Sequence, residues 1–142
     1  MAFVIHILAR MLLPWQLLMV DTLRHHLELR SRTKEFSYRI IRLFQSLPHN
    51  AAAYVIGKQL LRCGTSVAAN YRAVGRARSR ADACSKLAIV LEEADESVYW
   101  LECLADHNIV RADLLSELIA EANALVKIFS ASLNTARQNK HP

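Results

Sequence analysis

Apolar residues recur three and four residues apart over most of this chain, which is the spacing of helix faces. Four such stretches predict helices at about residues 32–47, at 51–74, from a cap at residue 79 or 82 to about 106, and at 112–136. No stretch alternates apolar and polar residues between turn signals, so no strand is predicted. Amphipathic helices joined by short connections predict an all-α, up-down-up-down antiparallel four-helix bundle.

The spacing also predicts which side chains face the core. The expected inward positions are Phe36, Ile40, Leu43, Phe44 and Leu47, then Ile56, Leu60, Cys63, Val67, Asn70 and Val74, then Leu87, Leu91, Ala94, Val98, Leu101 and Leu104, and finally Leu115, Leu118, Ala122, Leu125, Phe129 and Ser132. Asn70 places a polar amide in the second of these stripes. We expect it to hydrogen-bond across the seam between helices and to fix their register.

Five residues are candidates for the ends of the central helices. Pro48 cannot continue a helix, and Asn50 is a suitable N-cap for the next one. Gly75 ends the second helix, and Ser79 or Asp82 caps the third.

The first 29 residues form an apolar N-terminal extension, ahead of a bundle domain at 30–138 and a tail at 139–142. His6, Arg10 and Pro14 interrupt the apolar run before it reaches the roughly 18 residues of a membrane span, and no signal-peptide cleavage site follows. The extension either packs on the domain or a partner, or comes from a mis-assigned start, with Met11 or Met19 nearer the true one. We expect no membrane partner.

The three cysteines stand far apart, at positions 63, 84 and 103. This spacing fits neither a disulfide framework nor a zinc site, for which closely spaced pairs are typical. We therefore expect reduced thiols in a cytoplasmic protein.

Charge divides the chain into a basic and an acidic part. Residues 36–81 contain eight basic residues and no acid, whereas residues 82–121 contain ten acids against two bases. Such a division either pairs helices within or between subunits, or leaves a basic face free for a polyanion. The candidates for nucleic-acid contact are Arg62, Arg72, Arg76, Arg78 and Arg80, with Tyr71 as a ring on which a base could stack. The candidates for contact within the bundle or between subunits are Asn70, Glu92, Glu93 and Glu96.

No pattern of residues points to catalysis. Glu92 and Glu96 lie one helical turn apart, but di-metal bundle sites require Glu-x-x-His on two helices, and the fourth helix has no histidine. A phosphate-binding glycine loop is also missing. We expect no enzymatic activity, cofactor, metal or small-molecule substrate. A carboxylate-based bundle enzyme is the least favoured hypothesis, which bound iron or manganese would revive.

Residues 60–104, "LLRCGTSVAANYRAVGRARSRADACSKLAIVLEEADESVYWLECL", resemble a known family. They resemble the four-helix bundle proteins encoded within intervening sequences of bacterial 23S ribosomal RNA genes, whose superfamily includes the accessory protein of diversity-generating retroelements. The shared motif, "Q-L-x-R-x-x-x-S-x-x-x-N" and then "L-x-x-A-x-x-E-x-x-E-x-x-x-x-L", falls on Gln59, Leu60, Arg62, Ser66 and Asn70, and on Leu87, Val90, Glu93, Glu96 and Leu101.

The resemblance spans about residues 30–125 and implies a homopentamer without enzymatic activity. The retroelement relative implies binding to nucleic acid and to a reverse transcriptase. Two departures are visible: Val90 replaces the usual alanine, and "N-Y-R-A-V-G" replaces the common "N-I-A-E-G", which removes an acid and adds Arg72. Our leading hypothesis is an oligomeric bundle that contacts RNA or DNA through its basic second helix. The alternative is a structural bundle whose basic and acidic faces pair between subunits.

Overall fold

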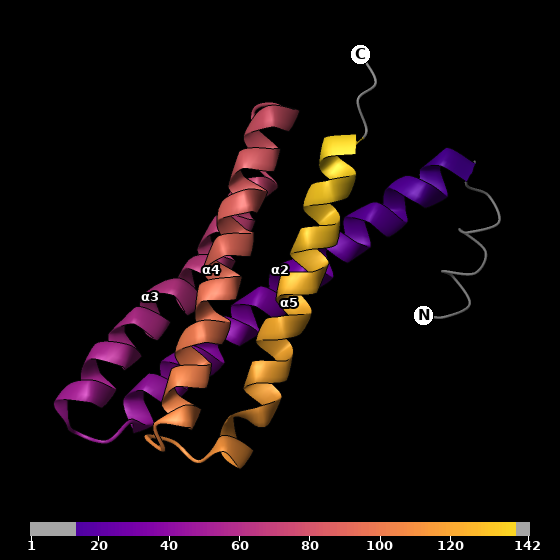
Figure 1. The fold of residues 1–142 in the computed structure, drawn as a ribbon. Helices are drawn as coiled ribbons and strands as arrows, with labels where there is room; N and C mark the ends of the chain where they lie inside the picture. The colour runs from indigo at the N-terminus through magenta and orange to yellow at the C-terminus, as the bar shows by residue number, and fades with distance from the viewer. Residues whose placement is uncertain (1–13, 139–142) are drawn as a thin grey trace, which may run out of the picture.

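The computed structural model describes residues 14–138, which form four helices joined by short turns (Figure 1). The helices are α2 (Pro14–Ser46), α3 (Ala51–Val74), α4 (Arg80–Asp106) and α5 (Ala112–Gln138). Each helix packs on the next one along the chain, and a smaller contact between α2 and α5 completes the bundle. No strand occurs within residues 14–138, so the predicted all-α, up-down-up-down arrangement is confirmed.

The helix ends follow the predicted capping residues closely. The Asn50 side chain accepts a hydrogen bond from the Ala53 amide at 2.9 Å, so α3 begins with a satisfied N-cap. Ser79 caps α4 in the same way through the Asp82 amide, which leaves Asp82 as the acid of the first turn. Gly75 follows the last residue of α3 in an ordinary right-handed conformation (φ −66°).

The first helix is longer than predicted. It begins at Pro14, so the predicted start near Arg32 is wrong, and the expected domain boundary at residue 30 falls inside α2. Proline is tolerated in the first turn of a helix, and no glycine or further proline interrupts residues 15–46. Among the described side chains of its early part, Met19, Leu23 and Leu27 are exposed, and α2 leans away from α5 there (Figure 1). Residues 1–13 and 139–142 lie outside the described residues.

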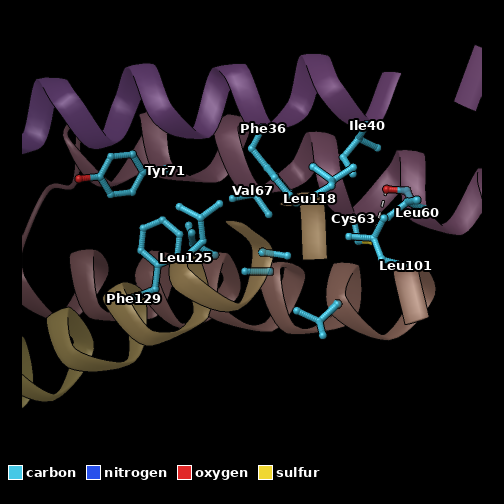
Figure 2. Packing of buried hydrophobic residues seen from close by; sticks show 14 of the residues in the cluster. Phe36, Ile40, Leu60, Cys63, Val67, Tyr71, Leu101, Leu118, Leu125 and Phe129 are labelled. Atoms are coloured by element: carbon cyan, nitrogen blue, oxygen red, sulfur yellow. Dashed lines mark hydrogen bonds between the residues drawn. The ribbon is translucent and has the colours of Figure 1, made fainter. Parts of the chain in front are cut away.

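The core is built from all four helices (Figure 2). Phe36 and Ile40 of α2 point towards Val67 and Leu60 of α3, while Leu125 and Phe129 enter from α5 (Figure 2). The buried residues of α4 are Leu87, Val90, Ala94, Ser97, Val98, Leu101 and Leu104. On α5, Leu133 is buried in place of the predicted Ser132, whose hydroxyl donates to the Ile128 carbonyl of its own helix.

The buried stripe of α3 differs from the predicted one. Its buried residues are Ala53, Gly57, Leu60, Cys63, Gly64, Val67 and Tyr71. Asn70 is only half buried, and its Nδ2 donates to the Ser66 carbonyl of the same helix at 2.9 Å. The predicted hydrogen bond from Asn70 across the seam is therefore wrong. The reason is that α3 packs on both α2 and α4, so its buried surface is wider than a single heptad seam and turns towards Tyr71.

The three cysteines are free thiols. Cys63 is fully buried, and the Ser97 hydroxyl lies 3.2 Å from its sulfur. Burial raises the pKa of the Cys63 thiol, so this group stays protonated near neutral pH. Cys84 and Cys103 are half buried.

Candidate nucleic-acid interface

The five arginines predicted to contact nucleic acid do not form one surface. Arg62 projects from α3 onto α4, where Nη1 lies 3.3 Å from Glu93 Oε2 and Nη2 hydrogen-bonds to Glu96 Oε1. Trp100 Nε1 donates to the same Glu96 oxygen at 3.0 Å. Arg62 therefore holds two helices together across the bundle surface.

This arrangement shifts the pKa values of the two glutamates in opposite directions. Hydrogen bonds from Arg62 and Trp100 lower the pKa of Glu96, because they stabilise the charged carboxylate. Partial burial raises the pKa of Glu93, and the attraction of Arg62 opposes that shift. Glu93 and Glu96, predicted to contact a neighbouring helix or subunit, thus pair within the chain.

Arg78 and Arg80 are engaged at the corner between α3 and α4. The Arg78 amide donates to Asp82 Oδ2 at 2.9 Å, and its guanidinium lies 3.9 Å from the same oxygen. Hydrogen bonds from Lys86 and from the Arg78 amide lower the pKa of Asp82. Arg80 Nε donates to the Ala136 carbonyl at 2.9 Å and so satisfies an end group of α5. The Arg78 backbone amide and the Arg80 side chain make the contacts at this corner, whereas the Arg78 side chain stays 91% exposed.

Arg72 and Arg76 have a different environment. Both side chains are exposed, and neither makes an ion pair or hydrogen bond with another described residue. They lie four residues apart, at the last turn of α3 and just beyond it. Of the five predicted arginines, these two keep their guanidinium groups unengaged.

Arg72 lies at a groove between α2 and α3 of about 280 Å³, which we call the basic groove. Its lining residues are Arg30, Lys34, Ser37, Tyr38, Ile41, Thr65, Ala68 and Arg72. Three of them are cationic and none is acidic. The Lys34 ammonium lies 5.5 Å from the centre of the Tyr38 ring, so a cation and an exposed aromatic ring stand together.

Sequence reasoning missed the residues that α2 contributes to this groove. Arg30, Lys34 and Tyr38 lie four residues apart and share one helix face, but the first two precede the acid-free run. The ring predicted for stacking, Tyr71, is instead 5% exposed and packs on Phe129, with ring centres 5.4 Å apart. The Tyr71 hydroxyl lies 3.1 Å from His26 Nδ1. Tyr38, not Tyr71, is the accessible ring.

Two exposed acids of α4 lie apart from the residues that line the basic groove. Glu92 and Asp95 project outward from α4, and neither is paired with another described residue. Within residues 14–138, no three His, Cys, Asp or Glu side chains are arranged to hold a metal ion. No helix in the described part of the chain has the length and apolar character needed to cross a membrane.

Motif residues meet at one place on the surface. Gln59 and Arg62 of α3 face Glu93 and Glu96 of α4, and Arg62 Nε lies 3.4 Å from Gln59 Oε1. These four residues belong to the pattern that the chain shares with the intervening-sequence proteins. In this chain, these motif residues join α3 to α4.

Comparison with known proteins supports the same assignment. The family model described as 23S rRNA-intervening sequence protein matches residues 25–131. A solved structure from Bacteroides thetaiotaomicron, described as a protein with unknown function from the S23 ribosomal protein family, is 32% identical. The match covers 77% of this chain and 97% of that one, with a TM-score of 0.72. None of the curated proteins compared with the chain matches it. The chain belongs to the family of 23S rRNA-intervening sequence proteins.

Proposed function

We propose that this family member is a non-enzymatic oligomeric bundle that contacts nucleic acid through the basic groove. The observation that carries the proposal is the set of three cations, Arg30, Lys34 and Arg72, around a groove without an acid. Arg76 extends the same charge beyond the end of α3. Guanidinium and ammonium groups without carboxylate partners are the groups that phosphate oxygens bind.

Binding of this kind should depend steeply on salt. Each phosphate neutralised by a cation releases condensed counterions, with a log–log slope of about −0.7 to −0.9 per phosphate. Titration of fluorescently labelled RNA and DNA at several salt concentrations measures that slope. Replacing Arg30, Lys34 and Arg72 together by alanine removes three contacts, so we expect the slope to become shallower by about 2 to 3.

Arg42→Ala provides the matched control. Arg42 is an exposed α2 arginine, but its Nη2 lies 2.7 Å from Glu35 Oε1 and it does not line the groove. We expect this variant to bind as the unmodified protein does. Loss of binding with Arg42→Ala to the same extent as with the groove variant, or no binding at low salt, would contradict the proposal.

A second candidate function is subunit pairing without nucleic acid. It is favoured by the exposed Glu92 and Asp95 on α4, which have no partner within the described residues and could face Arg72 of a neighbouring copy. Under this alternative Arg72→Glu breaks the assembly, and adding Asp95→Arg restores it. Light scattering coupled to size-exclusion chromatography measures the mass of the assembly. An assembly mass unchanged by Arg72→Glu would count against it.

The size and partners of the assembly belong to the same proposal. The family resemblance suggests a homopentamer, and the retroelement relative suggests a reverse transcriptase as protein partner. Light scattering on the unmodified protein tests the first suggestion. A reverse transcriptase gene beside this one, as opposed to a split 23S ribosomal RNA gene around it, would support the second.

A further inference from the structure

The basic groove has a charged end and an aromatic end. On α2, Arg30, Lys34 and Tyr38 follow one another at single-turn intervals of about 6 Å. On α3, which runs antiparallel, Arg72 lies beside the Arg30 end, since Tyr71 meets His26 and Gly64 meets Ser37. Tyr38 and Ile41 therefore lie at the opposite end from Arg30 and Arg72.

The aromatic end presents an accessible ring above an apolar floor. Tyr38 is 45% exposed, which is a high fraction for a large aromatic residue. Ile41 and Ala68 line the groove beside it, and the Lys34 ammonium stands 5.5 Å from the ring centre. An exposed ring next to cations is the combination on which unpaired bases stack while their phosphates are neutralised.

The aliphatic hydroxyl groups of the groove, on Ser37 and Thr65, are already engaged. Ser37 Oγ donates to the Gly64 carbonyl at 2.9 Å, and Thr65 Oγ1 donates to the Leu61 carbonyl at 2.7 Å. Neither proton is left to donate to the edge of a base. The groove can hold a base by its face on Tyr38 and a strand by its phosphates on the cations.

We propose that the basic groove takes a single strand of nucleic acid, with phosphates on Arg30, Lys34 and Arg72 and one base stacked on Tyr38. This inference rests on the proposed function and adds the form of the ligand. Bases of a duplex are stacked on one another and cannot reach a ring set between two helices, whereas unpaired bases can. Single-stranded RNA and DNA share this chemistry.

The test compares two tyrosines with the same local chemistry. Tyr38 in the groove and Tyr54 on α3 are both exposed, and each has a lysine ammonium over its ring, at 5.5 and 5.3 Å. Tyr54 does not line the groove. The variants Tyr38→Ala, Tyr38→Phe and Tyr54→Ala are titrated with labelled single-stranded RNA, single-stranded DNA and duplex DNA of the same mixed sequence.

We expect single strands to bind more tightly than the duplex. Tyr38→Ala should weaken single-strand binding about 5- to 100-fold, in line with the loss of one base–aromatic stack, and leave duplex binding unchanged. Tyr38→Phe keeps the ring and should retain affinity, as should Tyr54→Ala. The salt slope should stay the same in all three variants, because no phosphate contact is lost.

The outcomes separate this inference from the function on which it rests. Equal binding of single strands and duplex, with Tyr38→Ala as tight as the unmodified protein, overturns the single-strand inference while salt-dependent binding still supports the basic groove. No binding of any probe at low salt overturns both. A preference between the RNA and DNA single strands identifies which of the two the groove takes.

Discussion

Individual glycines set the distance between α2 and α3. A Cβ atom added to Gly64 would lie 2.8 Å from Ile40 Cγ1 and 3.0 Å from Ile40 Cγ2. Ile40 is fully buried and branched at Cβ, so it has few other conformations available. The hydroxyl of Ser37 also bonds to the Gly64 carbonyl, which keeps the two backbones close.

We therefore predict that Gly64→Ala lowers the free energy of unfolding by about 1 to 3 kcal/mol, as overpacking a core does. Urea unfolding followed by circular dichroism measures this change in the free energy of unfolding. Gly75→Ala is the control, because that glycine has a right-handed φ of −66° and its new methyl would press on the outer end of the half-buried His26 side chain, not on a β-branched core residue. If Gly64→Ala lowers the free energy of unfolding no more than Gly75→Ala does, α2 shifts freely along α3 and the prediction is wrong.

Among the helices, α3 and α4 are joined by an interaction that should respond to pH. Arg62 lowers the pKa of Glu96 and opposes the effect of burial on Glu93. Its stabilisation of these two carboxylates is present when both are ionised, above the ordinary glutamate pKa, and is lost as pH falls through their folded-state values. The Arg62 side chain is half exposed, so solvent screens much of the attraction.

We predict that Arg62→Met lowers the free energy of unfolding by about 1 kcal/mol or less at neutral pH. The difference from the unmodified protein should shrink as pH falls below the ordinary glutamate pKa of about 4.3 and on through the lowered folded-state pKa of Glu96. Urea unfolding at several pH values measures this change. Arg42→Met removes an exposed pair within α2 and should have a smaller effect. A constant difference between Arg62→Met and the unmodified protein at all pH values would mean that Arg62 acts through packing alone.

At the scale of the whole molecule, the early part of α2 contributes little to the bundle. Among its described side chains, the first buried one is Thr33, and only His26 and Leu29 of the preceding residues are partly covered. His26 bonds to Tyr71, and Leu29 packs against the core. Met19, Leu23 and Leu27 face outward.

We predict that a chain beginning at Met19 unfolds within about 0.5 kcal/mol of the full chain, because it loses no buried side chain that the structure describes. A chain beginning at Arg30 loses the contacts of His26 and Leu29, and should be less stable by about 1 to 3 kcal/mol. The midpoints of urea unfolding are compared for the full chain and the two shortened chains. A large loss of stability in the chain that begins at Met19 would show that residues before Met19 cover part of the bundle.

In the folded molecule, ion pairs within the chain neutralise some of the charges that the sequence divides into a basic and an acidic part. Arg32 and Arg39 of α2 reach Glu121 and Glu117 of α5, at 2.6 and 4.0 Å, and Arg62 reaches Glu93 and Glu96. These ion pairs neutralise part of the positive and part of the negative charge within one chain. Within the described residues, unpaired charge remains at the basic groove and on the outer side of α4, as well as at Arg76, Lys127 and Arg137.

Local features of the sequence determined the helical fold and most helix ends. Apolar spacing predicted all four helices, and Asn50 and Ser79 predicted two N-caps, because caps and amphipathic faces depend only on neighbouring residues. The motif in α3 and α4 also indicated the family to which the chain belongs. These properties are encoded within a few turns of chain.

Tertiary structure alone decided which residues form the candidate site. Five arginines look alike in the sequence, yet Arg62 and Arg80 are engaged by groups from distant positions, a glutamate of α4 and a carbonyl of α5. Arg78 meets the nearby Asp82, and the side chains of Arg72 and Arg76 stay unengaged. Arg30 and Lys34 join Arg72 only because α2 packs antiparallel on α3. Tyr71 is buried and Asn70 is turned to its own helix because α3 has two neighbours. Spacing along one helix carries no information about which other helix lies against each face.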